Sequence, residues 1–253
     1  MSKLLAIVPA YNEADAIAST VADLRANAPG WDVVVVDDGS TDATARHATA
    51  AGADVLRMPF NLGIGGAVQA GYLYAKEGGY DFAVQVDGDG QHDAAQIDDL
   101  LRHLHVHQGE VNMVTGSRFL VGDEEHGYKS SASRRLGIKI FGFILSRVTK
   151  RTVTDPTSGF RMCDRRAIEL FANDYPHDYP EVEAVLMVHA HRLASAEIPV
   201  TMRERQGGVS SINASRSIFY MTKVLLAIFV GLLRARPVVD VGDPAAVTAQ
   251  RGV

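Results

Sequence analysis

Two aspartates, Asp87 and Asp89, stand two residues apart directly after an apolar run at residues 82–86. An apolar run that leads into a polar loop is typical of a buried strand ending at the edge of a sheet. Protein-bound Mg²⁺ usually takes one or two carboxylates and completes its coordination with water and substrate phosphates. The pair therefore suits a divalent ion that neutralises a departing diphosphate. Asp and Gly also favour tight turns, so the pair alone indicates a turn equally well.

The composition of the 253-residue chain, 47% hydrophobic and 22% charged, predicts one principal domain. A net charge of -5 argues against a general nucleic-acid binder. Cys163 is the only cysteine, which excludes an internal disulfide and a cysteine-based zinc cluster, and we expect it to be a packing residue. The reducing cytoplasm is the expected location. Residues 1–8 predict a first strand and not a signal peptide.

Short β-rich runs alternate with longer helical stretches from Leu4 to Ser117. The expected strands cover residues 4–8, 32–36, 54–58, 82–86 and 113–116, and the expected helices lie near residues 15–28, 42–51, 65–77 and 93–107. This alternation predicts an α/β fold with a Rossmann-like, mainly parallel sheet and helices on both faces. Open sheets of this class bind ligands at the carboxyl ends of their strands, which is where the Asp87 loop falls.

Polar loops after the first two expected strands supply candidates for binding a nucleotide. Tyr11 can cover a planar base, and Glu13 can accept hydrogen bonds from base or ribose or simply favour a helix start. Asp38, at the end of the second strand, is a further candidate contact. Ser40 or Thr41 is expected to cap the next helix.

A glycine-rich segment at residues 61–67 is similar to a dinucleotide-binding fingerprint. That fingerprint belongs to the first strand–helix turn of a fold, whereas this segment follows the third expected strand. We therefore expect close packing around the loop, and not a hydride-transfer enzyme.

Two apolar helices with basic flanks are expected after Ser117. The first runs from Leu136 to about Val148 and places apolar residues at helical spacing, namely Ile138, Phe141, Ile144, Leu145 and Val148. The second, residues 217–233, contains an uninterrupted apolar run of ten residues, against the roughly 20 needed to span a bilayer. Amphipathic interfacial helices fit this pattern, and two core helices fit it nearly as well. Residues 237–253 are predicted to form a disordered tail.

Together these segments resemble the family 2 glycosyltransferases of the GT-A fold, a nucleotide-sugar-binding α/β fold with an Asp-x-Asp metal site. The matching segments occur in the family's order: residues 9–13 (PAYNE), 37–40 (DDGS), 87–92 (DGDGQH) and 116–118 (GSR). Residues 155–161 (DPTSGFR) narrow the resemblance to the branch of dolichyl-phosphate mannosyltransferases and bacterial polyprenyl-phosphate sugar transferases. It implies a GT-A domain over residues 1–236, with a nucleotide-sugar-binding half at 1–117 and an acceptor and membrane-facing half at 118–236.

The resemblance also implies roles for particular residues. The substrates would contact Pro9, Tyr11, Glu13, Val36, Asp38, Asp87, Gly88, Arg118, Ser158 and Arg205. Mg²⁺ or Mn²⁺ would meet Asp87, Asp89 and Gln91, and the catalytic residues would be Asp89, Arg118 and Arg134. Residues 205–211 lack a lysine that dolichyl-phosphate mannosyltransferases often carry near the end of this loop, so GDP-mannose is not singled out as the donor.

The acceptor decides what the protein must supply. A phosphate monoester has a second pKa of roughly 6 and is mostly dianionic at neutral pH, so it needs cations more than a base. Arginine suits phosphate, and the second half offers Arg118, Arg134, Arg135 and Arg161. A saccharide hydroxyl would instead need a general base, for which the candidates are Asp155, Glu181 and Glu183.

The expected function is a metal-dependent, inverting transfer of a sugar from a nucleotide-diphosphate sugar to a membrane polyprenyl phosphate. It would take place at the cytoplasmic face of the cell membrane, for cell-envelope glycan or protein glycosylation. One alternative is transfer to a saccharide hydroxyl in polysaccharide synthesis, and another is a noncatalytic nucleotide-sugar-binding subunit. A small separate membrane protein is a further candidate partner, and no nucleic-acid partner is expected.

Overall fold

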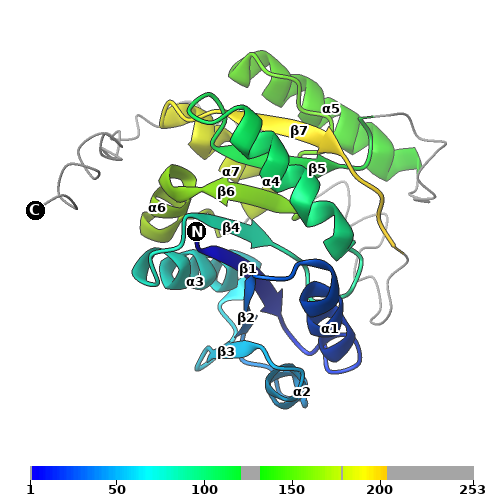
Figure 1. Ribbon diagram of the computed structural model, residues 1–253. Coiled ribbons are helices and arrows are strands. Elements are labelled where there is room, and N and C mark those ends of the chain that lie inside the picture. The colour runs from blue at the N-terminus through cyan, green and yellow to red at the C-terminus, as the bar shows by residue number, and fades with distance from the viewer. Residues whose placement is uncertain (1, 121–131, 178, 204–253) are drawn as a thin grey trace, which may run out of the picture.

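The computed structural model describes residues 2–120, 132–177 and 179–203, which build a seven-stranded mixed sheet in the order β3-β2-β1-β4-β6-β5-β7 (Figure 1). The strands are β1 (Leu4–Ala10), β2 (Asp32–Asp37), β3 (Asp54–Arg57), β4 (Phe82–Gln85), β5 (Met113–Ser117), β6 (Arg161–Asp164) and β7 (Ser195–Pro199). The helices are α1 (Ile17–Asn27), α2 (Thr44–Ala50), α3 (Gly63–Glu77), the 3₁₀ helix η1 (Ala94–Gln96), α4 (Ile97–Val106), α5 (Ala132–Thr149), α6 (Arg165–Asn173) and α7 (Pro180–Ala190).

The first four strands are parallel, as the alternating pattern predicts. β1 pairs with β2 on one side and β4 on the other, and β3 extends the sheet beyond β2. The valine run of β2 is buried, which is typical of a parallel strand covered by helices on both faces. Because these strands point the same way, the loops after β1, β2, β3 and β4 meet at one edge.

β6 is antiparallel and lies between β4 and β5. Its first residue, Arg161, is therefore level with Gln85, the last residue of β4. This reversal brings residues 155–160 to the same edge as the loop after β4. The two halves of the chain thus share one sheet.

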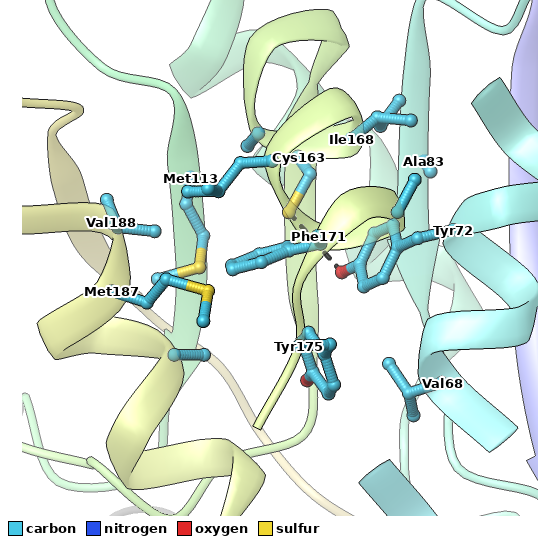
Figure 2. Packing of buried hydrophobic residues seen from close by; sticks show 14 of the residues in the cluster. Val68, Tyr72, Ala83, Met113, Cys163, Ile168, Phe171, Tyr175, Met187 and Val188 are labelled. Atoms are coloured by element: carbon cyan, nitrogen blue, oxygen red, sulfur yellow. Dashed lines mark hydrogen bonds between the residues drawn. The ribbon is translucent and has the colours of Figure 1, made fainter. Parts of the chain in front are cut away.

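Helices cover both faces of the sheet, with α4 in front and α7 behind in Figure 1. α1, α2 and α4 pack on one apolar cluster, and α3, α5, α6 and α7 pack on the other. Figure 2 shows Cys163 of β6 inside the second cluster, with its Sγ 3.4 Å from the hydroxyl of Tyr72. The thiol is fully buried and burial raises its pKa to about 12, so Cys163 is a packing residue, as expected.

α5 includes the helix expected at residues 136–148, but its apolar stripe faces inward. Ile138, Phe141 and Leu145 are buried, and the last two belong to the apolar cluster on which α3, α6 and α7 also pack. For this stripe, the alternative of a core helix is therefore correct. Among the described side chains of α5, the large exposed apolar ones are Ile140 and Phe143. Within the described part of the chain, no helix has both the length and the apolarity needed to cross a membrane. Residues 217–233 and the tail at 237–253 lie outside that part.

Candidate active site

A cavity of about 300 Å³ opens at the carboxyl edge of β1, β2 and β4. The residues that line it, which we call the donor pocket, are Pro9, Ala10, Tyr11, Glu13, Asp38, Asn61, Gly63, Ile64, Ala67, Asp87, Gly88 and Asp89. Seven of the residues proposed from the sequence are therefore brought together here. The lining includes four carboxylates, and none of the described lining residues is basic.

Asp38 joins the loop after β2 to the start of α3. Its Oδ1 accepts a hydrogen bond from the Leu62 amide at 2.7 Å, and its Oδ2 accepts one from the Gly63 amide at 3.0 Å. Burial raises the pKa of this carboxyl, although the two amide bonds oppose the shift. Asp38 therefore shapes the pocket as well as lining it.

The glycine-rich segment after β3 packs closely, as expected for residues 61–67. A Cβ on Gly65 would clash with the backbone of Pro176 and His177, which lies between α6 and α7. Asn61, Gly63, Ile64 and Ala67 of this segment line the donor pocket. These four residues were not predicted as site residues, and their position after a parallel strand is the signal that could have found them.

The loops after β1 and β2 hold each other through Asn12, whose φ of 54° is left-handed. Its amide donates to Ser40 Oγ at 2.9 Å, and its Oδ1 accepts from the Thr41 amide at 2.9 Å. The expectation that Ser40 or Thr41 caps the next helix is wrong: Ala43 is the N-cap residue of α2 and makes no side-chain cap bond. The reason is that both residues are engaged by the neighbouring loop.

The loop from Asp87 to His92, here called the acidic loop, is fixed at both ends by His92. The Asp87 amide donates to His92 Nδ1 at 3.0 Å, so the ring proton of the neutral imidazole lies on Nε2. Nε2 in turn lies 3.6 Å from Asp87 Oδ2. The ring is buried and stacks on Phe160 with centroids 4.8 Å apart. The Asp87 side chain remains 39% exposed toward the donor pocket.

Asp89 is buried to 9% exposure and accepts a hydrogen bond from the Gln91 amide through Oδ1 at 3.1 Å. Gln91 is not among the residues that line the pocket. The described residues contain no group of three His, Cys, Asp or Glu side chains arranged for a metal. Two carboxylates are nevertheless enough for Mg²⁺ when phosphates supply further oxygens, so Asp87 and Asp89 fit a divalent ion that binds together with a diphosphate.

Arg118 is engaged by Asp155 and does not line the donor pocket. Its Nε donates to Asp155 Oδ2 at 2.6 Å, and its Nη2 donates to Oδ1 at 2.8 Å and to Thr157 Oγ1 at 2.9 Å. Arg118 is 8% exposed and Asp155 is fully buried. The expected phosphate contact of Arg118 thus competes with a buried bidentate ion pair. The pair also leaves Asp155 poorly placed to act as a general base.

Arg161 of β6 is 1% exposed and holds the 155–161 segment from inside. Its Nε donates to the Ser158 carbonyl at 2.9 Å, and its Nη2 donates to the carbonyls of Pro156 and Glu181. Nη1 is buried without a hydrogen-bond partner. The sequence suggested Arg161 as a phosphate ligand, but its role is structural. Its position at the start of the antiparallel strand β6 buries it.

The remaining predicted site residues lie away from the pocket or outside the described part. Val36 is fully buried in the core opposite Pro9, and Ser158 is buried with its Oγ accepting from the Phe160 amide. Arg134 lies near the start of α5, and its side chain is outside the described residues, as is Arg205. Glu181 is the second residue of α7, and burial raises its pKa, with the charge of Asp87 adding to the shift.

A family model described as glycosyl transferase family 2 matches residues 5–171, more than half of the chain. Undecaprenyl-phosphate mannosyltransferase of Micrococcus luteus is 31% identical over 220 residues, covering 83% of this chain and 88% of the relative. Polyprenol monophosphomannose synthase of Mycolicibacterium smegmatis is 29% identical, covering 88% of this chain and 85% of that protein.

Solved structures share the fold. Glucosyl-3-phosphoglycerate synthase from Mycobacterium tuberculosis, in complex with Mn²⁺, UDP and glucosyl-3-phosphoglycerate, matches with a TM-score of 0.66 at 20% sequence identity. The match covers 92% of this chain and 79% of that one. The mainly parallel sheet with flanking helices is therefore the GT-A fold expected from the sequence.

Proposed function

Because the chain belongs to glycosyl transferase family 2 and is a glycosyltransferase, we propose that it moves one sugar from a nucleotide-diphosphate sugar to a polyprenyl phosphate, with inversion and with Mg²⁺ or Mn²⁺. This class of acceptor appears in the names of its relatives, which include polyprenyl mannosyltransferases and dolichyl-phosphate β-glucosyltransferases. The site would face the cytoplasm, at the membrane surface.

The observation that carries the donor half of the proposal is the charge of the donor pocket. Glu13, Asp38, Asp87 and Asp89 all line it. A diphosphate is itself anionic, and carboxylates within a few ångströms would repel it. A divalent ion held by Asp87 and Asp89 would reverse that repulsion and would neutralise the diphosphate as it leaves.

The chain's own residues supply the rest of the donor site. Tyr11 lines the pocket, is half exposed, and is available to cover the base. Glu13 lines the pocket and would accept hydrogen bonds from base or ribose, in keeping with its sequence assignment. Asp38 keeps the glycine-rich loop in place through the Leu62 and Gly63 amides.

The acceptor half of the proposal rests on the relatives and on the state of Asp155. A dianionic phosphate attacks without a strong general base, whereas a saccharide hydroxyl needs one. Asp155, one of three candidates for that base, has both carboxylate oxygens bound to Arg118. This geometry disfavours Asp155 as the base that a hydroxyl acceptor would require.

The exposed face of α5 supports action at a membrane surface. Phe143 is 65% exposed and Ile140 is 41% exposed. The Arg147 guanidinium lies 5.8 Å from the Phe143 ring centroid, and Lys139 is exposed on the same helix. Aromatic and aliphatic side chains among cations are suited to an anionic lipid interface.

Sugar transfer itself tests the proposal. Purified protein is incubated with undecaprenyl phosphate, Mn²⁺ and a panel of nucleotide sugars, and lipid products are identified by mass spectrometry. One sugar added to the lipid phosphate is the expected result, and Asp89→Asn should reduce the rate at least about a hundredfold because the diphosphate would lose its ion. Transfer only to a soluble saccharide would contradict the proposed acceptor.

Vesicle binding tests the membrane surface separately. Phe143→Ser should weaken sedimentation with anionic phosphatidylglycerol vesicles by several-fold. Val106→Ser is the matched control, because Val106 is an exposed apolar residue at the end of α4. Equal sedimentation of the two variants would argue against the α5 face.

A further inference from the structure

Two of the six residues of the acidic loop are glycines. Gly88 and Gly90 alternate with its aspartates, and Gly90 has a φ of 76°, in the left-handed region. Glycine leaves the backbone many alternative conformations. A loop of this composition needs contacts from outside to direct Asp89 into the donor pocket.

Such contacts come from the segment at residues 200–203, which follows β7. The Arg203 amide donates to the Gln91 carbonyl at 2.9 Å, and Met202 pairs with His92 in an antiparallel bridge. Gln91 in turn donates its amide to Asp89 Oδ1. The segment is thus one residue removed from the carboxylate that lines the pocket.

The Arg203 side chain fastens this contact to two other elements. Its Nη1 lies 2.8 Å from Asp23 Oδ2 on α1, and its Nη2 lies 2.6 Å from Asp93 Oδ1, directly after the acidic loop. Asp93 also caps η1 by accepting from the Ala95 amide, and Asp23 accepts from the Ala94 amide. One guanidinium therefore sits between two carboxylates that would otherwise repel each other.

The neighbouring residues hold the same parts together. Gln96 of η1 bonds both the amide and the carbonyl of Thr201, each at 2.8 Å. Thr20 of α1 donates to the Gly88 carbonyl at 3.2 Å. α1, the acidic loop, η1 and the 200–203 segment form one connected unit, and Arg203 is the cation at its centre.

We infer that Arg203 is a positioning residue for Asp89. It keeps the acidic loop in the conformation that binds a divalent ion with the nucleoside diphosphate, and it acts only through the loop. The inference rests on the proposed donor chemistry but is independent of the acceptor. Without the guanidinium, Asp23 and Asp93 repel and the loop shifts, so Asp89 meets the ion less well.

Calorimetric titration of GDP and of UDP at increasing Mn²⁺ concentrations tests this role. In Arg203→Ala, the Mn²⁺ concentration for half-maximal nucleotide binding should rise about tenfold, the size usual for residues that orient metal ligands. Nucleotide affinity at saturating Mn²⁺ should change little, because the base and ribose contacts remain. The Mn²⁺ requirement of Arg203→Lys should lie between those of the wild type and Arg203→Ala, since an ammonium lacks the planar fork that meets both carboxylates.

Arg102→Ala is the matched control. Arg102 also makes a 2.6 Å ion pair, with Asp99, but on the exposed side of α4. It should leave the Mn²⁺ requirement unchanged. An unchanged Mn²⁺ requirement in Arg203→Ala, or an equal loss of nucleotide affinity at all Mn²⁺ concentrations, would overturn the inference.

The outcomes separate this inference from the proposed function. Suppose that Arg203→Ala raises the Mn²⁺ concentration needed for nucleotide binding, but the wild-type chain transfers no sugar to polyprenyl phosphate. In that case only the acceptor proposal fails. A wild-type chain that binds neither nucleotide with Mn²⁺ contradicts the donor proposal and this inference together.

Discussion

Replacement of Asp155 by asparagine should be one of the most destabilising conservative changes in this protein. The variant keeps the shape of the side chain and removes its charge, which leaves the Arg118 guanidinium 8% exposed and without its carboxylate. Breaking a buried ion pair by neutralising one partner costs about 3–5 kcal/mol. The two charge-assisted side-chain bonds at 2.6 and 2.8 Å support the same range, at about 1.5–3 kcal/mol each.

Asp99→Asn is the control for this prediction. The Arg102–Asp99 pair has the same 2.6 Å separation as the Arg118 Nε–Asp155 Oδ2 contact, but both side chains are more than half exposed. Exposed pairs contribute at most about 1 kcal/mol. Burial, and not distance, therefore accounts for the expected difference between the two variants.

Thermal unfolding followed by circular dichroism measures the effect. For a chain of this size, 1 kcal/mol corresponds to about 2–4 °C, so Asp155→Asn should lower the unfolding temperature by roughly 6–20 °C. Urea unfolding gives the free energy directly if the transition is two-state. An Asp155→Asn variant as stable as Asp99→Asn would refute the argument that the Arg118 fork is committed to Asp155.

Three further changes have expected outcomes. Cys163 should resist a thiol reagent at about pH 8 until the protein is unfolded in urea, because its pKa is raised to about 12; modification of the native state at the rate of a free thiol would contradict this. Gly159→Ala should weaken Mn²⁺-dependent nucleotide binding about tenfold, since its Cβ would lie 2.9 Å from Asp87 Oδ1; calorimetry measures the loss, and unchanged binding would mean that Asp87 tolerates the shift. Glu181 has a raised pKa in the folded state, so its cost to stability builds up as pH rises from the ordinary pKa of the unfolded chain to the raised pKa and stays constant above it; Glu181→Gln should remove this cost, and its unfolding temperature relative to wild type should rise from about pH 5 to about pH 8. A difference independent of pH would exclude that origin.

The first five strands were predictable because each is a compact apolar run followed by a polar loop. β6 was not, since its residues Arg161–Asp164 include no β-branched or aromatic side chain and show no strand pattern. It is a strand because β4 and β5 offer it hydrogen bonds on both sides. Such pairing is a tertiary effect that local propensity does not report. The same holds for α6 and α7, which were not predicted from the sequence.

The donor pocket was easier to predict than the acceptor half. Its carboxylates follow strands that are parallel, so strand order alone brings them to one edge. Arg118 and Asp155 are 37 residues apart, and only the antiparallel β6 brings the 155–160 segment back to β5. No sequence spacing reveals that partnership. The arginines were therefore predicted to bind phosphates, whereas Arg118 and Arg161 stabilise the fold through contacts with the 155–160 segment.

The acidic loop shows that a turn and a metal site need not be competing interpretations of Asp87 and Asp89. Asp89 uses Oδ1 to accept from the Gln91 amide, which is turn chemistry, and it still lines the donor pocket. Asp87 donates its amide to His92 while its carboxylate stays exposed to the same pocket. The hydrogen bonds of the turn are what aim the carboxylates. Because the intervening glycines do not hold that turn on their own, its geometry depends on His92 within the loop and on Arg203 outside it.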